Sequence, residues 1–264
     1  MGKTKALRVA VAGAAAGSVN ALLAVTLAPR CAACARVLDA PLAGPVCAPC
    51  WGLVRTLAPP FCRACGDPLP SWRVISVVTE RCPRCRRRPP VIDAGCAAGE
   101  YEGTLREIVH AFKYEGRRSL ARPLAAMMRT AGAAMLRDAD WVVPVPLHPW
   151  RRVHRGFNQA ADLARDLDRP MLHALFRWRA TPAQTGLTAA ARRHNVRDAF
   201  AITPLRGAAT RAALDGRIVV LVDDVRTTGA TLNECARVLK EAGARDVRAL
   251  TVARAFYKRD ATAA

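Results

Sequence analysis

Residues 219–231 read VVLVDDVRTTGAT, and this stretch decides the fold of the chain. The four apolar and mostly β-branched residues at its start predict a strand that is buried on both faces of a parallel sheet. Two carboxylates follow, then a loop of Thr and Gly, then a helical pattern from Leu232 to Glu241. Such a loop is typical of a phosphate site, because free backbone N–H groups and the positive end of the helix face the anion.

The two carboxylates, Asp223 and Asp224, predict a second ligand group beside the phosphate. Carboxylates repel a phosphate, but they accept hydrogen bonds from vicinal hydroxyls such as those of a ribose. The stretch therefore predicts a ribose 5-phosphate site. The alternative is an ordinary strand–helix turn with a Thr as its N-cap. This alternative is less favoured, because chance rarely places an Asp-Asp pair and a Thr-Thr-Gly-x-Thr loop together after a buried strand.

The chain of 264 residues is strongly basic and has room for one large domain and a small one. Its 41 Lys and Arg residues exceed its 21 Asp and Glu residues, which gives a formal net charge of +20. This charge indicates anionic partners, such as nucleic acid or phosphorylated small molecules. The uncharged run 9–29 resembles a signal peptide or a weak membrane span. Its Ala and Gly content instead predicts an Ala-rich helix over 1–30, no stable membrane insertion and a cytoplasmic location.

Eight of the ten cysteines form four Cys-x-x-Cys pairs, and Cys96 and Cys235 are left over. Paired thiolates form a knuckle, and two knuckles complete a tetrahedral zinc site. Disulfides and a redox dithiol are the alternatives, but four copies of the pair favour metal. Whether the pairs combine sequentially or interleave stays open. The predicted ligands of two structural zinc ions are Cys31, Cys34, Cys47, Cys50, Cys62, Cys65, Cys82 and Cys85.

Changes in pattern divide the chain into three predicted parts: an N-terminal helix over 1–30, a double zinc ribbon over 31–90 and an α/β domain over 91–264. Frequent prolines exclude long helices from the ribbon part. In the third part, helices are expected at 103–113, 119–136, 157–168 and 231–242, and strands at 141–145, 170–175, 217–222 and 247–253. This alternation predicts a parallel sheet with ligands at the carboxyl ends of its strands.

Three further groups of residues are candidates for the same site. The run 143–149, VPVPLHP, ends a predicted strand and precedes several arginines that suit phosphate oxygens, although they would equally suit a solvated helix start. Lys113 alone would be a surface lysine at a helix end. The polar stretch 176–200 predicts either a mobile loop that closes over a sugar or an ordinary surface connection. Its candidate residues are Gln184, Leu187, Arg192, Asn195 and Phe200.

Residues 219–231 resemble the binding motif of the type I phosphoribosyltransferases, in which the two acids hold the ribose hydroxyls and the Thr/Gly loop wraps the 5-phosphate. Arg226 departs from that motif, because most of the family has an apolar residue there. From residue 31 to about 254 the chain resembles the ComF family, which is associated with natural competence and DNA uptake. The landmarks are the four cysteine pairs, Phe112–Gly116, Val143–Pro149, Arg155–Gln159, Gln184 with Leu187, Arg192 with Asn195, and the Asp-Asp loop.

The ComF resemblance implies a small double zinc ribbon ahead of a type I phosphoribosyltransferase fold. It further implies binding of phosphoribosyl pyrophosphate with Mg²⁺, and a phosphoribosyltransferase activity whose acceptor it does not identify. The aspartate pair would orient the ribose in catalysis. The implied ligand residues are Lys113, Pro146, His148, Arg155, Asn158, Gln159, Arg192, Asp223, Asp224, Thr227, Thr228, Gly229, Ala230 and Thr231.

Two functions of other classes stay open. The ribbon part is basic, and Trp51, Phe61 and Trp72 would suit stacking on the bases of single-stranded DNA. The same aromatic side chains would equally suit the small core of a ribbon. The third possibility is a structural zinc module that docks a competence helicase or a channel partner.

Overall fold

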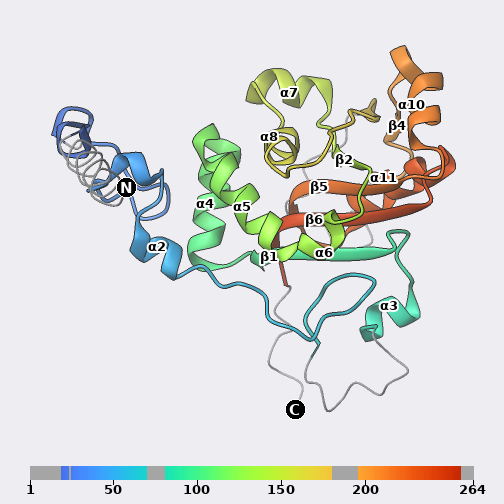
Figure 1. Ribbon diagram of the computed structural model, residues 1–264, viewed down its shortest axis with the longest axis horizontal. Helices are drawn as coiled ribbons and strands as arrows, with labels where there is room; N and C mark the ends of the chain where they lie inside the picture. Colours follow the sequence, from blue (N-terminus) through green and yellow to red (C-terminus); the bar gives the residue numbers. More distant parts are fainter. Residues whose placement is uncertain (1–18, 24, 70–80, 180–195, 257–264) are drawn as a thin grey trace, which may run out of the picture.

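The computed structural model describes residues 19–23, 25–69, 81–179 and 196–256 (Figure 1). Its centre is a parallel sheet with the strand order β1-β6-β5-β2, beside a separate antiparallel pair, β3-β4. The strands are β1 (Ala94–Glu100), β2 (Trp141–Pro144), β3 (Leu175–Arg177), β4 (Phe200–Ile202), β5 (Ile218–Arg226) and β6 (Asp246–Arg254). The longer helices are α4 (Gly103–Tyr114), α5 (Ala121–Ala131), α10 (Gly207–Leu214) and α11 (Ala230–Glu241). Shorter ones are α2 (Ala48–Gly52), α3 (Pro83–Arg87), α6 (Ala133–Leu136), α7 (Pro149–Arg155), α8 (Gln159–Arg165) and the 3-10 turns η1 (Pro41–Ala43), η3 (Arg118–Leu120) and η4 (Pro204–Arg206).

Alternate residues of β5 divide the core into two layers. Val220 and Val222 belong to the cluster that contains the apolar faces of α4, α5 and α8. Val219 and Leu221 belong to the cluster built around α11. All four side chains are fully buried, so the strand buried on both faces and the parallel α/β sheet are confirmed. Helices cover both faces of the sheet (Figure 1).

β5 is longer than the predicted strand 217–222, because it continues through both aspartates to Arg226. On one side it pairs with β6 as far as Arg226, whereas β2 ends at Pro144, opposite Val222. In this last part of β5 each carboxylate accepts a hydrogen bond from the next amide of the chain: Asp223 from the amide of Asp224 at 2.9 Å, and Asp224 from that of Val225 at 2.7 Å. The predicted Asp-Asp loop is therefore the end of a strand.

β1 is a strand that the pattern of the sequence did not predict. Its residues, AGCAAGE, lack the β-branched and aromatic side chains that favour strands. Two of its glycines are close to backbone from the ribbon part. A Cβ on Gly95 would lie 2.9 Å from the Cys65 carbonyl, and one on Gly99 would lie 2.9 Å from the Arg55 carbonyl. The small residues of β1 allow the ribbon part to approach this edge of the sheet.

The helices also differ in detail from the prediction. The single helix expected over 119–136 is divided into η3, α5 and α6, with a break at Gly132. A Cβ on Gly132 would lie 2.8 Å from the side chain of Leu250 in β6, so the helix passes very close to the sheet there. The expected strand over 170–175 is reduced to one bridge, from Met171 to Val142, before β3 begins. Part of residues 19–27 is helical, and none of the helices in the described ranges combines the length and apolarity of a membrane span.

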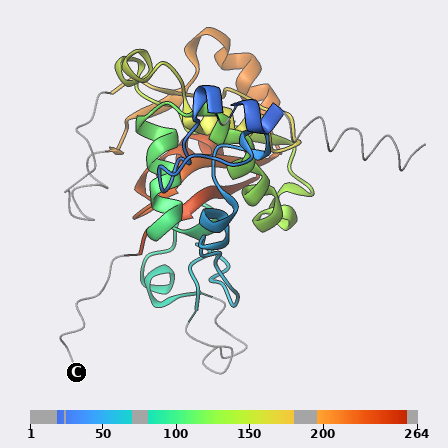
Figure 2. The same cartoon turned by 90° about the vertical axis from the view of Figure 1, so that its left-hand side faces the viewer.

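The two halves of the ribbon part join the sheet domain differently. The first half contributes Cys31, Leu38, Val46 and Cys50 to the same apolar cluster as α4 and α5. The second half has a small apolar cluster of its own, which contains the four cysteines from Cys62 to Cys85. In Figure 2 the first half lies in front of the green helices, and the second half lies below the sheet. The second half is therefore held mainly by polar contacts and by close backbone approach.

Candidate functional site

A cavity of about 550 Å³ opens at the carboxyl ends of β5 and β2 and at the start of α11. This is the edge of a parallel α/β sheet at which ligands bind. The predicted ligand residues that line it are Lys113, Pro146, Arg155, Asn158, Gln159, Asp223, Asp224, Thr227, Gly229, Ala230 and Thr231. The fold thus brings together residues that lie far apart in the sequence.

The aspartate pair has two different environments on adjacent residues. Asp224 is buried, and both of its carboxylate oxygens contact Nζ of Lys113, at 2.8 and 3.1 Å. Asp223 keeps part of its surface open to the cavity and is not paired in this way. Burial and the neighbouring Asp224 raise the pKa of Asp223 to about 7, although Lys113 opposes them. One carboxylate is therefore fixed by an ion pair, and the other faces the cavity with a raised pKa.

Lys113 is a component of the cavity and not a free surface lysine. It lies in the last turn of α4, whose opposite face is anchored by Phe112 and other apolar side chains. Burial would lower the pKa of Lys113, but Asp224 and Asp223 outweigh it and hold the pKa above its usual value. The ammonium group therefore stays charged beside the two aspartates.

Residues 227–231, predicted above to bind a phosphate, run from the end of β5 into the first turn of α11, and we call them the phosphate loop. Gly229 has a φ of 79°, in the left-handed region that favours glycine, and it is the N-cap of α11. The hydroxyl of Thr228 accepts a hydrogen bond from the amide of Ala230 at 3.4 Å. Thr228 does not line the cavity, whereas the other four residues of the loop do. The arrangement presents backbone N–H groups and the positive end of a twelve-residue helix to an anion.

The run 143–149 and the residues that follow it as far as Gln159 include some that line the cavity and others that only cap helices. His148 does not line it; its Nδ1 accepts the amide of Trp150 and caps α7. Asn158 lines the cavity and also caps α8, because its Oδ1 accepts the Ala160 amide and its Nδ2 donates to the carbonyl of Val145. Gln159 accepts from Arg155 at 3.0 Å and donates to the carbonyl of Lys113 at 3.4 Å. This motif therefore joins the end of α4 to the start of α8.

The cavity also contains residues that the sequence analysis did not single out, among them Tyr101, Tyr114, Trp150 and Arg177. Arg177 is only 5% exposed, and its guanidinium lies over the ring of Phe200 at 5.3 Å. Phe200 was one of five candidates in the polar stretch; the other four, Gln184 to Asn195, lie outside the described residues, as does Trp72. No local pattern in the sequence distinguishes Arg177 from the other arginines, because its burial and its contact with Phe200 depend on the β3-β4 pair.

Eight cysteines form the two predicted clusters, and the pairs combine sequentially: Cys31, Cys34, Cys47 and Cys50 in the first, Cys62, Cys65, Cys82 and Cys85 in the second. Within each cluster the four Sγ atoms lie within 4.8 Å of one another. Zn–S bonds of about 2.3 Å give a tetrahedron with edges of about 3.8 Å. The Sγ atoms of Cys34 and Cys47 are 3.9 Å apart, and those of Cys65 and Cys82 are 3.7 Å apart. Both clusters therefore fit structural zinc.

Comparison with known proteins gives the same two parts. Residues 22–86 match the family model of a double zinc ribbon domain, and residues 154–263 match that of a phosphoribosyl transferase domain. Competence protein F of Haemophilus influenzae is 32% identical over 220 residues, which cover 80% of this chain and 90% of that protein. The chain belongs to the ComF family. The ComF relatives include DNA utilization protein YhgH of Escherichia coli, 32% identical over 77% of this chain and 87% of that one, and Competence protein ComFC of Bacillus subtilis, 27% identical over 75% and 79%.

Proposed function

We propose that this ComF-family protein binds phosphoribosyl pyrophosphate with Mg²⁺ at the cavity beside Asp223 and Asp224, and that it acts in DNA uptake. One observation carries the first part: two carboxylates at the end of β5 line the same cavity as Thr227, Gly229, Ala230 and Thr231 at the start of α11, and a helix start of this kind suits an anion. The names of the relatives, a competence protein and a DNA utilization protein, support the second part.

The two aspartates would hold the ribose hydroxyls, and the phosphate loop would hold the 5-phosphate. Asp223 is the better acceptor for a hydroxyl, because Lys113 already contacts both oxygens of Asp224. Arg155, which lines the cavity at the end of α7, is placed to bind phosphate oxygens. In the proposed arrangement the sugar is therefore positioned both by its ring hydroxyls and by its 5-phosphate.

Transfer would be a displacement at the anomeric carbon, in which the bond to pyrophosphate breaks as the bond to an acceptor forms. Carboxylate oxygens are donors that suit Mg²⁺, and the ion, when bound, neutralises charge on the leaving group. The charged groups of the cavity would supply positioning and electrostatic stabilisation. Among the described residues of the cavity, we assign none as the base that activates an acceptor.

Calorimetry with phosphoribosyl pyrophosphate and Mg²⁺ tests the proposal. Asp223→Ala combined with Asp224→Ala should weaken binding by at least about 100-fold, because both charged acceptors are lost. The matched control is Glu107→Ala with Glu241→Ala, which removes the same charge at exposed helix positions outside the cavity. Equal affinity in the wild type and the aspartate double variant, with both folded, would refute binding at this site.

A non-catalytic accessory function has its own support in the ribbon part. Arg86, Arg87 and Arg88 are all exposed at the end of α3, beside the second cysteine cluster. Such a basic segment suits single-stranded DNA or an acidic surface of a helicase partner. Pyrophosphate release on addition of candidate acceptors separates the two functions, because an accessory would bind without releasing it. Trp51 packs against the core, which leaves Phe61, 39% exposed, as a described aromatic side chain for stacking.

A further inference from the structure

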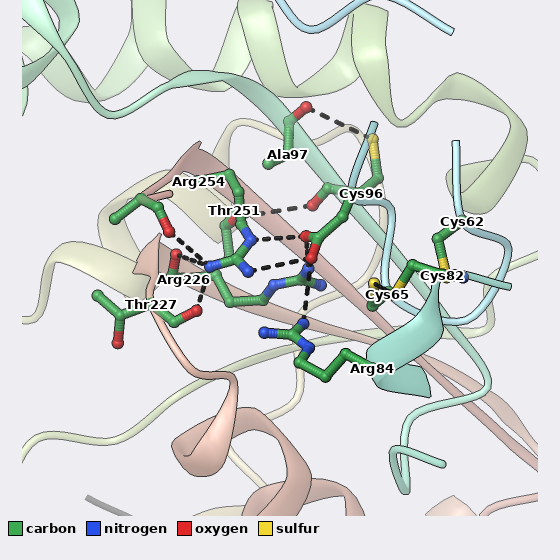
Figure 3. A network of polar contacts seen from close by, with 12 residues as sticks. Cys62, Cys65, Cys82, Arg84, Cys96, Ala97, Arg226, Thr227, Thr251 and Arg254 are labelled. Atoms are coloured by element: carbon green, nitrogen blue, oxygen red, sulfur yellow. Dashed lines mark hydrogen bonds and ion pairs between the residues drawn. The ribbon is translucent and has the colours of Figure 1, made fainter. Parts of the chain in front are cut away.

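The second zinc ribbon contacts the strand ends next to the phosphate loop through one carboxylate. Asp67 lies just after the Cys62–Cys65 knuckle, and its side chain is 15% exposed. Three arginines donate to it: Arg226 at 2.6 Å, Arg254 at 2.6 and 3.1 Å, and Arg84 at 3.2 Å. Figure 3 labels these three arginines, whose guanidinium groups lie close together. Arg226 and Arg254 are each 4% exposed and come from the ends of β5 and β6. One ribbon carboxylate therefore holds two buried arginines of the sheet domain.

Arg254 connects this contact to the phosphate loop. While its Nε and Nη2 donate to Asp67, its Nη1 donates to the carbonyl of Thr227, the first residue of the loop, and to that of Arg226 at 3.2 Å. A carbonyl and the next N–H belong to one rigid peptide plane. Fixing these two carbonyls therefore fixes the orientation of the amides of Thr227 and Thr228.

The position of Asp67 is set by the knuckle itself. The amide of Cys62 donates to the carbonyl of Asp67 at 2.8 Å, and the amide of Gly66 donates to the carbonyl of Cys62 at 2.6 Å. Gly66 approaches the sheet so closely that a Cβ there would lie 2.1 Å from the carbonyl oxygen of Gly95. The turn that holds Asp67 is thus fixed both to a cysteine ligand and to β1.

Arg226 is a second link between the ribbon and the phosphate loop. It is the last residue of β5 and directly precedes the loop. Its side chain turns to the ribbon, where only Asp67 offers it a carboxylate within 4.0 Å among the described residues. The residue that precedes the phosphate loop is therefore paired with the ribbon carboxylate.

We propose that Asp67 is a positioning residue for the phosphate loop: through Arg254 and Arg226, the second zinc ribbon holds the loop in the conformation that binds the 5-phosphate. This inference rests on the proposed function. A merely structural salt bridge would change thermal stability alone. A positioning contact also changes loop motion and ligand affinity in protein that is still folded.

Asp67→Asn in the full-length, zinc-loaded protein is the main test. It keeps the shape of the side chain but removes the charge that holds the two arginines. We expect hydrogen exchange of the amides of 227–231 to become about tenfold faster without any ligand, and the Kd for phosphoribosyl pyrophosphate with Mg²⁺ to rise about tenfold. Zinc content should stay the same. The matched control is Arg117→Ala, which removes a contact with the carbonyl of Arg30 in the first ribbon and an ion pair with Glu115, and which leaves Asp67 and its arginines in place.

Arg254→Lys is the second variant, for use if Asp67→Asn does not fold. A lysine keeps the charge, but it cannot hold Asp67 and two carbonyls with a planar fork of donors. It should produce the same faster exchange. Unchanged exchange and unchanged Kd in a folded variant would overturn the inference while leaving the binding proposal intact. If the wild type binds no phosphoribosyl pyrophosphate, the proposed function fails, and unchanged exchange of 227–231 would still overturn the positioning function of Asp67.

Discussion

Replacing Asp223 with Asn should stabilise the unliganded protein at pH 8, although it removes a group that we propose binds the ribose. Burial and the adjacent Asp224 raise the pKa of Asp223 to about 7. A raised carboxyl pKa means that the folded protein holds the proton more tightly than the unfolded chain. Stability is therefore lost as the pH rises from about 4 through about 7. Asparagine carries no charge, so the variant avoids this loss.

The magnitude follows from the two pKa values. The change from 3.8 to about 7 would correspond to about 4 kcal/mol if it acted in full. Because Asp223 keeps some contact with solvent, we expect about 1–3 kcal/mol at pH 8 and less than about half of that at pH 5. For a chain of this size, the midpoint of thermal unfolding at pH 8 should rise by roughly 2–10 °C.

Thermal unfolding followed by circular dichroism at pH 8 and pH 5, with zinc present, measures this effect. The control is Asp224→Asn on the adjacent residue. It removes the 2.8 Å ion pair of Lys113 and leaves a half-buried ammonium without this partner, so it should lower the midpoint. If both variants lower the midpoint equally at pH 8, or if the gain of Asp223→Asn does not shrink at pH 5, the reasoning about Asp223 is wrong.

Three further predictions concern other parts of the chain. Elemental analysis should find about two zinc ions per chain, also after replacement of Cys96 and Cys235 by Ser; protein purified without chelator that lacks zinc would contradict the cluster assignment. Replacing Arg86–Arg88 with Ala should weaken binding of single-stranded DNA by fluorescence anisotropy and flatten its salt dependence by up to about three units; an unchanged slope would place any DNA site elsewhere. Gly132→Ala should cost about 1–3 kcal/mol in urea unfolding, because its methyl group would lie 2.8 Å from a leucine of β6, whereas Gly207→Ala, with open space around it, should be nearly neutral.

The features that the sequence could predict are local ones. The cysteine spacing predicted both clusters, since two knuckles that lie close along the chain complete each tetrahedron. The run of β-branched residues at 219–222 predicted a buried strand, because its side chains pack on both faces. The residues expected at the site mostly line one cavity, and their functions stay predictions. The division of the chain at residues 30 and 90 also stays a prediction.

The features that the sequence could not predict depend on contacts between distant segments. β1 forms from small residues because the neighbouring backbone leaves no room for larger ones. The strand propensities of single residues contain no information about such a neighbour. Arg226 was visible only as a departure from a motif, since its partner Asp67 lies in the ribbon. His148 was expected at the ligand because it follows a strand, whereas its side chain caps α7. In each case tertiary contact decides which of several local possibilities is realised.

The position of β1 has a consequence for synthesis of the chain. β1 is made first among the strands of the sheet, but its partner β6 is made last. At ribosomal rates of about 5–20 residues per second, β1 waits on the order of ten seconds for that partner. An unpaired strand edge invites pairing with other nascent chains. The other edge of β1 is covered by segments that have already left the ribosome, since Thr56 bridges to Gly99 and the carbonyl of Arg55 accepts the amide of Glu100 at 2.9 Å. Because the ribbons are made before the sheet, β1 can wait for β6 with one open edge and not two.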